Sequence, residues 1–118
     1  MIAIRGAITV ERDTPDLVKE ATIELMNEII MKNQLAPEKM VSILFTATRD
    51  IQSVYPGKFI REVMNIEDVA ILHFQEMHVE GSLPLCLRVL IHYNDDIKGC
   101  PVYLRKARNL RPDLEKPL

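Results

Sequence analysis

The stretch that most constrains the fold is residues 2–10, IAIRGAITV, in which four of the five positions on one face are aliphatic. Those positions are Ile2, Ile4, Ile8 and Val10. Because successive side chains of a strand point to opposite faces, this alternation predicts a strand with one aliphatic face and with Arg5 on the other. The chain must therefore bury one side of a sheet.

The next stretch predicts a long amphipathic helix that can cover that side. Thr14 is a candidate N-cap, Pro15 suits the first helical position, and Asp16 is an acid in the first turn. Apolar residues then recur at helical spacing, at Leu17, Ala21, Met26, Ile29 and Ile30. We expect the helix to end near Asn33.

The remaining pattern predicts further strands and one short helix. Strand-rich runs occupy residues 40–48, 68–74, 82–93 and 100–107, and a short helix opens near Pro56. This order predicts an α+β fold with a mixed sheet covered by helices on one side. We expect one domain over residues 1–114 and a flexible C-terminal tail over residues 115–118. A sheet with one uncovered face predicts a homo-oligomer.

Composition excludes several classes of protein. The chain has 118 residues, 47% of them hydrophobic, and a formal net charge of −2. This charge gives no general attraction to nucleic acid or to an anionic membrane. No apolar run is long enough for a membrane span, and no secretory signal is evident, so we expect a cytoplasmic protein. Cys86 and Cys100 lack metal-like spacing and are expected to be free thiols.

Arg5 and Arg88 are notable because each lies in the middle of an apolar strand. A buried guanidinium without a partner is costly, so each needs an anion or a polar cavity. A structural ion pair, or an edge-strand arginine with its head in water, is the simpler interpretation from periodicity alone. By alternation, Arg88 shares a face with Cys86, Leu90 and His92.

Glu76 follows a predicted strand and has histidines on both sides, at 73 and 78. It could be an ordinary loop acid, or it could accept a hydrogen bond from a ligand hydroxyl. A metal site is disfavoured, because His73 and Glu76 fall on opposite strand faces and no other cluster completes a ligand set. The chain also has no phosphate-binding glycine loop and no nucleophile signature.

Further cations and hydroxyls add to this set. Lys58 and Arg61 are three residues apart and would share a helix face, which by itself would usually be solvated. Tyr103 and Arg111 add a hydroxyl and another cation. Together, these residues indicate a small organic ligand with more than one negative charge.

The chain resembles the small homotrimeric chorismate mutases with a pseudo-α/β-barrel arrangement. The similar segments are IRGAITVERDT, YPGKFIRE, FQEMHVEGSLPLCLRV and VYLRKARNLRPDL, and they extend over nearly the whole chain. The resemblance implies a trimer with active sites in clefts between neighbouring subunits. It implies conversion of chorismate to prephenate for aromatic amino-acid biosynthesis. This intramolecular rearrangement needs neither a cofactor nor a nucleophile.

The resemblance also implies a role for each candidate residue. Arg5 would bind a substrate carboxylate, Arg88 would reach the ether oxygen and a carboxylate, and Glu76 would accept from the ring hydroxyl. Tyr103 would bond to a carboxylate. The residues implied to line or close the pocket are Tyr55, Lys58, Arg61 and Arg111.

Three positions differ from the family pattern: Tyr55 stands in place of phenylalanine, His73 in place of cysteine, and Leu72 in place of threonine. His73 could donate to the substrate hydroxyl or be a core histidine. The competing hypothesis is a trimeric protein that binds a small carboxylate, or serves a regulatory role, without rearranging its ligand. A trimeric imine deaminase of similar shape is disfavoured, because its expected sequence hallmarks are not evident.

Overall fold

The computed structural model describes residues 1–111, so the tail expected at residues 115–118 lies outside the described residues. The elements are β1 (Ile2–Thr9), α1 (Pro15–Asn33), the 3-10 helix η1 (Pro37–Lys39), β2 (Met40–Ala47), α2 (Lys58–Glu62), β3 (Ala70–Gln75), β4 (Cys86–Tyr93), β5 (Val102–Leu104) and the 3-10 helix η2 (Arg105–Asn109). The predicted order of strands and helices is confirmed.

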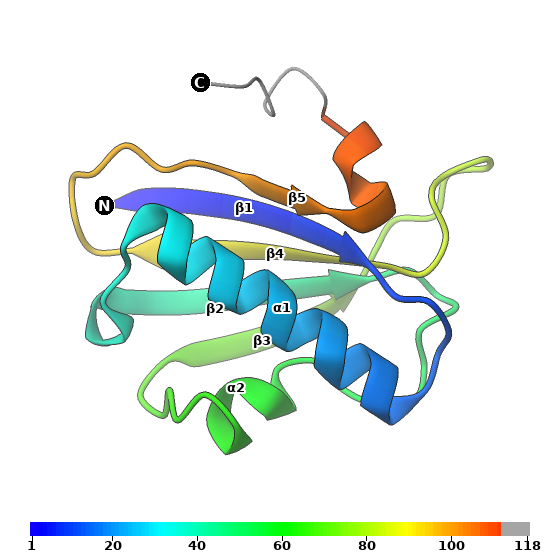
Figure 1. Ribbon diagram of the computed structural model, residues 1–118, viewed down its shortest axis with the longest axis horizontal. Helices are drawn as coiled ribbons and strands as arrows, with labels where there is room; N and C mark the ends of the chain where they lie inside the picture. The colour runs from blue at the N-terminus through cyan, green and yellow to red at the C-terminus, as the bar shows by residue number, and fades with distance from the viewer. Residues whose placement is uncertain (112–118) are drawn as a thin grey trace.

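The strands form one mixed five-stranded sheet in the order β3-β2-β4-β1-β5 (Figure 1). β4 is antiparallel to both β1 and β2, whereas β5 is parallel to β1 and β3 is parallel to β2. β1 and β2 are therefore parallel to each other with β4 inserted between them. A helical crossover is needed to connect parallel strands, and α1 provides it between β1 and β2.

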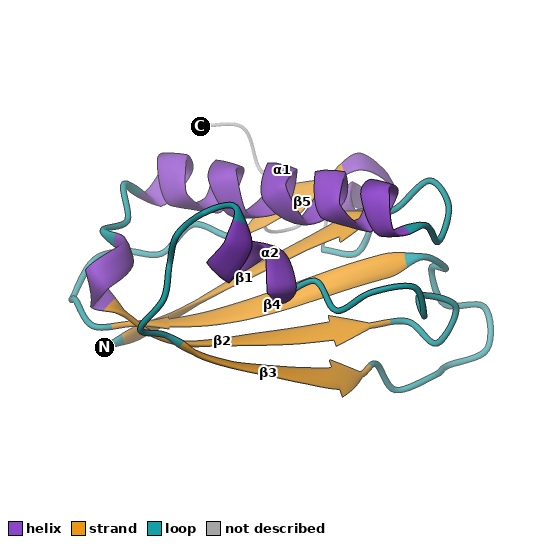
Figure 2. Cartoon of the chain, turned by 90° about the horizontal axis from the view of Figure 1, so that it is seen from below, coloured by secondary structure: helices purple, strands orange, loops and turns teal. Residues whose placement is uncertain are grey.

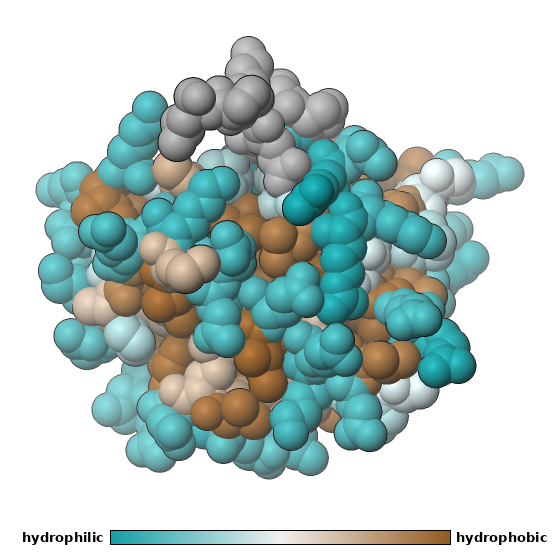
Figure 3. All heavy atoms as spheres, in the orientation of Figure 1, coloured by the Kyte–Doolittle hydropathy of each residue, from teal (hydrophilic) through white to brown (hydrophobic). Residues whose placement is uncertain are grey.

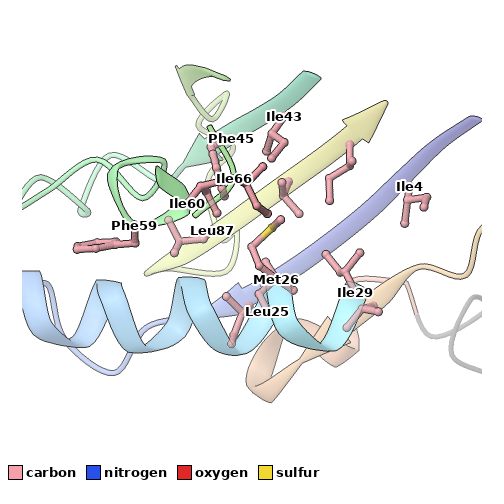
Figure 4. Close-up of a cluster of buried hydrophobic side chains, with 14 of the residues drawn as sticks. Ile4, Leu25, Met26, Ile29, Ile43, Phe45, Phe59, Ile60, Ile66 and Leu87 are labelled. Atoms are coloured by element: carbon pink, nitrogen blue, oxygen red, sulfur yellow. The ribbon is translucent and has the colours of Figure 1, made fainter. Parts of the chain in front are cut away.

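Both α-helices lie on one side of the sheet, as predicted (Figure 2). The aliphatic faces of the strands point toward them, and side chains of α1 such as Leu25, Met26 and Ile29 meet Ile4 and Ile43 there (Figure 4). All five of these side chains are almost fully buried. This core accounts for the alternation at the start of the chain.

The N-terminal boundary predicted for α1 is confirmed by its cap. The hydroxyl of Thr14 accepts a hydrogen bond from Leu17 N at 3.2 Å, and Pro15 is the first helical residue. At the other end Gln34 has a left-handed backbone, with φ 52°, and its N–H bonds to carbonyls of the last turn. The buried face of α1 consists of Val18, Ala21, Thr22, Leu25, Met26 and Ile29. Leu17 and Ile30 are only partly buried at its margin.

The second helix is shorter than its sequence suggested. Pro56 lies in the preceding turn, and α2 comprises only five residues, beginning at Lys58. Phe59 and Ile60 are buried and join the core. Since a helix of little more than one turn has a small dipole, its N-terminus gives little help in binding an anion.

The two faces of the sheet differ in cover. The helix side is a mixed surface in which hydrophilic residues surround hydrophobic patches (Figure 3). On the opposite face, η2 follows edge strand β5, and its Ala107 packs with Ala7 and Tyr103. Leu72 and Phe74 of β3 point to that same face and remain 57% and 50% exposed. Within residues 1–111, no helix is long and apolar enough to cross a membrane.

Candidate active site

A row of side chains crosses the face of the sheet opposite the α-helices. Arg88 of β4 is paired in register with Thr46 of β2 on one side and with Ala7 of β1 on the other. Ala7 is in turn paired with Tyr103 of β5. Since directly paired residues of neighbouring strands project to the same face, these four side chains share it. Ala7, between Arg88 and Tyr103, is buried because Ala107 of η2 packs over it.

Arg88 forms an ion pair with Glu76, the residue that follows β3. Its Nε atom lies 3.1 Å from Oε1 of Glu76. This Nε is buried, but its N–H is not aligned for a hydrogen bond, so charge attraction rather than a directed bond holds the pair. The two side chains retain 42% and 26% of their surface exposed. The guanidinium is therefore oriented but not enclosed.

Arg5 and Cys86 lie on the same face as Arg88. Arg5 is paired with Leu90, so it is a diagonal neighbour of Arg88 on the adjacent strand, and its side chain is exposed. Cys86 is a buried free thiol two residues before Arg88. Burial raises the pKa of the Cys86 thiol, and the positive charge of Arg88 only partly opposes this rise. The thiol is thus neutral, and the cations dominate the charge of this face.

A cavity of about 690 Å³ lies at the other end of the candidate site, where β2 and β3 end. It is lined by residues 45–49, 51–56 and 73–75 and by Lys58. Arg49 and Lys58 contribute positive charge, and the part of the chain that the structure describes adds no aspartate or glutamate to the lining. A cationic lining of this kind suits an anionic ligand.

Two carboxylates hold the loop that forms much of this cavity. Asp13 accepts hydrogen bonds from Gln52 N at 2.9 Å and from Ser53 N at 3.1 Å. Burial tends to raise the pKa of Asp13, but hydrogen bonds from Ser53 and Gln52 outweigh it, and the pKa is lowered. Asp50 accepts from Leu85 N at 3.0 Å and ties the same loop to the start of β4.

His73 occupies the wall of the cavity on the helix side of β3. Its Nε2 accepts a hydrogen bond from Gly57 N at 2.9 Å. Its ring stacks on Phe45 with 5.6 Å between centroids, and Tyr55 lies tilted against it at 5.0 Å. In a single copy of the chain, His73 is therefore a half-buried residue of the cavity wall whose Nε2 is occupied by Gly57.

Nearly the whole chain matches a known family. The family model described as chorismate mutase type I matches residues 1–114. The chain belongs to this family. Chorismate mutase function, expected from the sequence, is thereby confirmed.

Individual chorismate mutases agree with this assignment. The chain is 41% identical to chorismate mutase AroH of Bacillus subtilis (strain 168) over 114 residues, which cover 94% of this chain and 90% of that protein. It is also 41% identical to chorismate mutase AroH of Thermus thermophilus over 116 residues, covering 95% and 94%. The solved chorismate mutase Cth-682 of Clostridium thermocellum superposes with a TM-score of 0.89 at 36% identity, covering 92% of this chain and 99% of that one. The predicted fold class is confirmed by this superposition.

Within this chorismate mutase chain, the predicted site residues fall into two groups. Arg5, Glu76, Arg88 and Tyr103 come together on the sheet face opposite the α-helices, and none of them lines the cavity. Tyr55, Lys58 and His73 line the cavity, whereas Arg61 is outside its lining, with its Nη2 3.5 Å from Val69 O, and its charge acts on His73. Arg111 is half-buried two residues after η2. One copy thus does not bring all the candidates to one pocket.

Arg49 is a lining residue that sequence reasoning did not select. Arg49 directly follows the strand run predicted at residues 40–48, so the alternation of that run does not include it. An exposed arginine after a strand has no sequence pattern that marks it as a site residue. Only the return of the loop through Tyr55 places it at the cavity. Among residues 1–111, no three side chains of the metal-binding types cluster together, and His73 and Glu76 belong to different groups.

Proposed function

We propose that the chain rearranges chorismate to prephenate in clefts shared by two copies of a cytoplasmic homotrimer. The observation that carries this proposal is the pairing of Arg88 with Glu76 beside Arg5 on an uncovered sheet face, in a member of the chorismate mutase type I family. In each cleft, this face of one copy meets the cavity around Tyr55 and Lys58 of a neighbour.

The division of the candidates supports a shared cleft. The ion pair lies on the sheet face opposite the α-helices. Lys58 belongs to a cavity that none of the candidate residues on that face lines. The exposed Leu72 and Phe74 give the uncovered face apolar area for contact with another copy. A cyclic trimer, in which each interface joins two different surfaces of neighbouring copies, would bury these residues and join the two groups.

Substrate positioning is the first task of the proposed site. The reaction requires the enolpyruvyl arm of chorismate to lie over the ring, and the two carboxylates are the natural handles for holding that conformer. Arg5 and Tyr103 would hold one carboxylate from the sheet face, and Lys58, Arg61 and Arg111 would attract the dianion or close the pocket. Tyr55 would lie beside the ring.

Charge stabilisation is the second task, and we assign it to Arg88. As the carbon–oxygen bond stretches, negative charge develops on the ether oxygen. A guanidinium already oriented by Glu76 needs little reorganisation to meet this charge, so it stabilises the transition state more than the ground state. Glu76 would also accept from the ring hydroxyl.

The test is the loss of chorismate ultraviolet absorbance with purified, chelator-treated protein, with prephenate identified by its acid conversion to phenylpyruvate. We expect saturable turnover that does not depend on added metal. Sedimentation in the same buffer should give three times the mass of the chain. A trimer that binds chorismate without consuming it would overturn the enzymatic proposal and favour the carboxylate-binding alternative.

A further inference from the structure

The ring of His73 is held on three sides. Phe45 of β2 stacks on it with an interplanar angle of 12°, and Tyr55 lies against it at 51°. Its Nε2 is 2.9 Å from Gly57 N, which can only donate. Nε2 must therefore be the unprotonated nitrogen, and the neutral ring carries its proton on Nδ1.

Gly57 is matched to this ring by size. A Cβ added at residue 57 would lie 2.7 Å from both Cε1 and Nε2 of His73. The backbone of Gly57 is right-handed helical, with φ −63°, so its conformation does not require glycine. Glycine is required at this position because the ring of His73 leaves no room for a Cβ atom.

We infer that His73 is a positioning residue: its neutral ring holds the turn that presents Tyr55 and Lys58, and protonation of the ring releases this turn. A protonated Nε2 would place a donor against the donor of Gly57 and remove the hydrogen bond. Tyr55 precedes Gly57 by two residues and Lys58 follows it directly, so loss of this contact loosens both. The inference rests on the proposed function, which places both side chains at the substrate.

The charges around the ring favour its neutral form. Arg61 and Lys58 come from α2 and Arg49 from the end of β2, while Phe45 and Tyr55 present aromatic rings. Among residues 1–111, no carboxylate lines the cavity to stabilise an imidazolium. Burial, and after it the charge of Arg61, lower the pKa of His73 below its ordinary value of 6.5. The turn is therefore held at neutral pH and is released only in acid.

The kinetic test compares wild type, His73→Gln and His73→Leu between pH 8 and pH 5. The substrate carboxylates stay ionised over this range. Glutamine offers an oxygen acceptor that does not titrate, and leucine offers none. We expect the KM of wild type to rise about five-fold at the acidic end, as for loss of one hydrogen bond, while that of His73→Gln changes far less. His73→Leu should have a raised KM at both ends. Equal pH profiles for wild type and His73→Gln would overturn the inference.

A structural test without substrate separates this inference from the proposed function. In nitrogen-15 NMR of the full-length wild-type protein, we expect the Nδ1–H tautomer of His73 at neutral pH. The amide of Gly57 should shift in step with the ring as pH falls. A protonated Nε2 at neutral pH would overturn the inference even in an active enzyme. So would a Gly57 amide whose chemical shift does not change when the ring titrates. If the protein does not turn over chorismate, the proposed function fails while this measurement still tests the contact, including where His73→Leu does not fold.

Discussion

Glu76 Oε1 lies 3.1 Å from Arg88 Nε, and this pair connects the end of β3 to the first part of β4 across the face of the sheet opposite the α-helices. The two strands are not neighbours, since β2 lies between them. The side chain of Glu76 therefore reaches across the end of β2, to which its backbone is fixed because Glu76 N donates to Ala47 O at 2.9 Å. The orientation of the arginine thus depends on backbone contacts of β2.

Replacement of Arg88 should reduce turnover far more than substrate binding. We expect Arg88→Ala to lower kcat by at least about 100-fold, because a preorganised donor to the developing charge is lost. Arg88→Lys should recover only part of this rate, since an ammonium lacks the planar fork. Arg5→Ala is the matched control and should mainly raise KM. Steady-state kinetics would decide, and a near-normal kcat for Arg88→Ala would contradict the assigned role.

Replacement of Glu76 tests whether the orientation of Arg88 matters. Glu76→Gln keeps the shape of the side chain and removes the charge that attracts the guanidinium. We expect kcat to fall by about ten-fold or more. The free energy of unfolding should change by less than about 1 kcal/mol, because partly exposed ion pairs contribute little. Turnover and urea unfolding would be measured on the same sample; an unchanged kcat would mean that Arg88 needs no partner.

Replacement of Phe74 tests the proposed assembly. This side chain is 50% exposed on the face that we expect another copy to cover. Phe74→Lys should reduce the sedimenting mass toward that of one chain and reduce activity with it, because burying an unpaired ammonium in an interface is costly. Met31→Lys is a control, since Met31 is exposed on α1, on the other side of the sheet. Full assembly of Phe74→Lys would show that this face stays uncovered.

Replacement of Asp13 tests the loop that lines the cavity. Asp13→Ala removes the acceptors for Gln52 N and Ser53 N. We expect KM to rise about three- to ten-fold with little change in kcat, because the loss of such hydrogen bonds loosens the wall of the pocket and not the charge at Arg88. Glu11 is also an exposed acid shortly before α1, and Glu11→Ala should leave KM unchanged. Equal kinetics for the two variants would indicate that the loop is held by other contacts.

The lowered pKa of His73 has a consequence for stability. A histidine whose pKa is lower when folded gives its full contribution above the ordinary value of 6.5, and this contribution is lost as pH falls through 6.5 toward the folded value. Wild type should therefore lose stability between pH 8 and pH 5 relative to His73→Gln, which has no such proton. Urea midpoints of both proteins at several pH values would measure this difference, and parallel curves would contradict it.

Local chemistry determined the elements of this fold. Strict alternation placed Ile4 and Ile8 on the core face and Arg5 on the other, and the Thr14–Pro15 pair set the start of α1. The extent of α2 was predicted less accurately than that of α1. Its apolar residues suited a helix from Pro56, but the turn before Lys58 is held by the ring of His73, which lies 16 residues further along the chain.

The sequence by itself determined the faces of the strands, the family, and the set of charged residues expected at the site, because periodicity and motif depend on local order along the chain. Only the tertiary structure decided how these residues group. Strand order placed Arg88 opposite Ala7 and Thr46 and brought Glu76 to its Nε, and neither Arg88 nor Glu76 lines the cavity around His73. Pairing between distant strands is set by how the whole sheet packs under α1, and no local pattern specifies it.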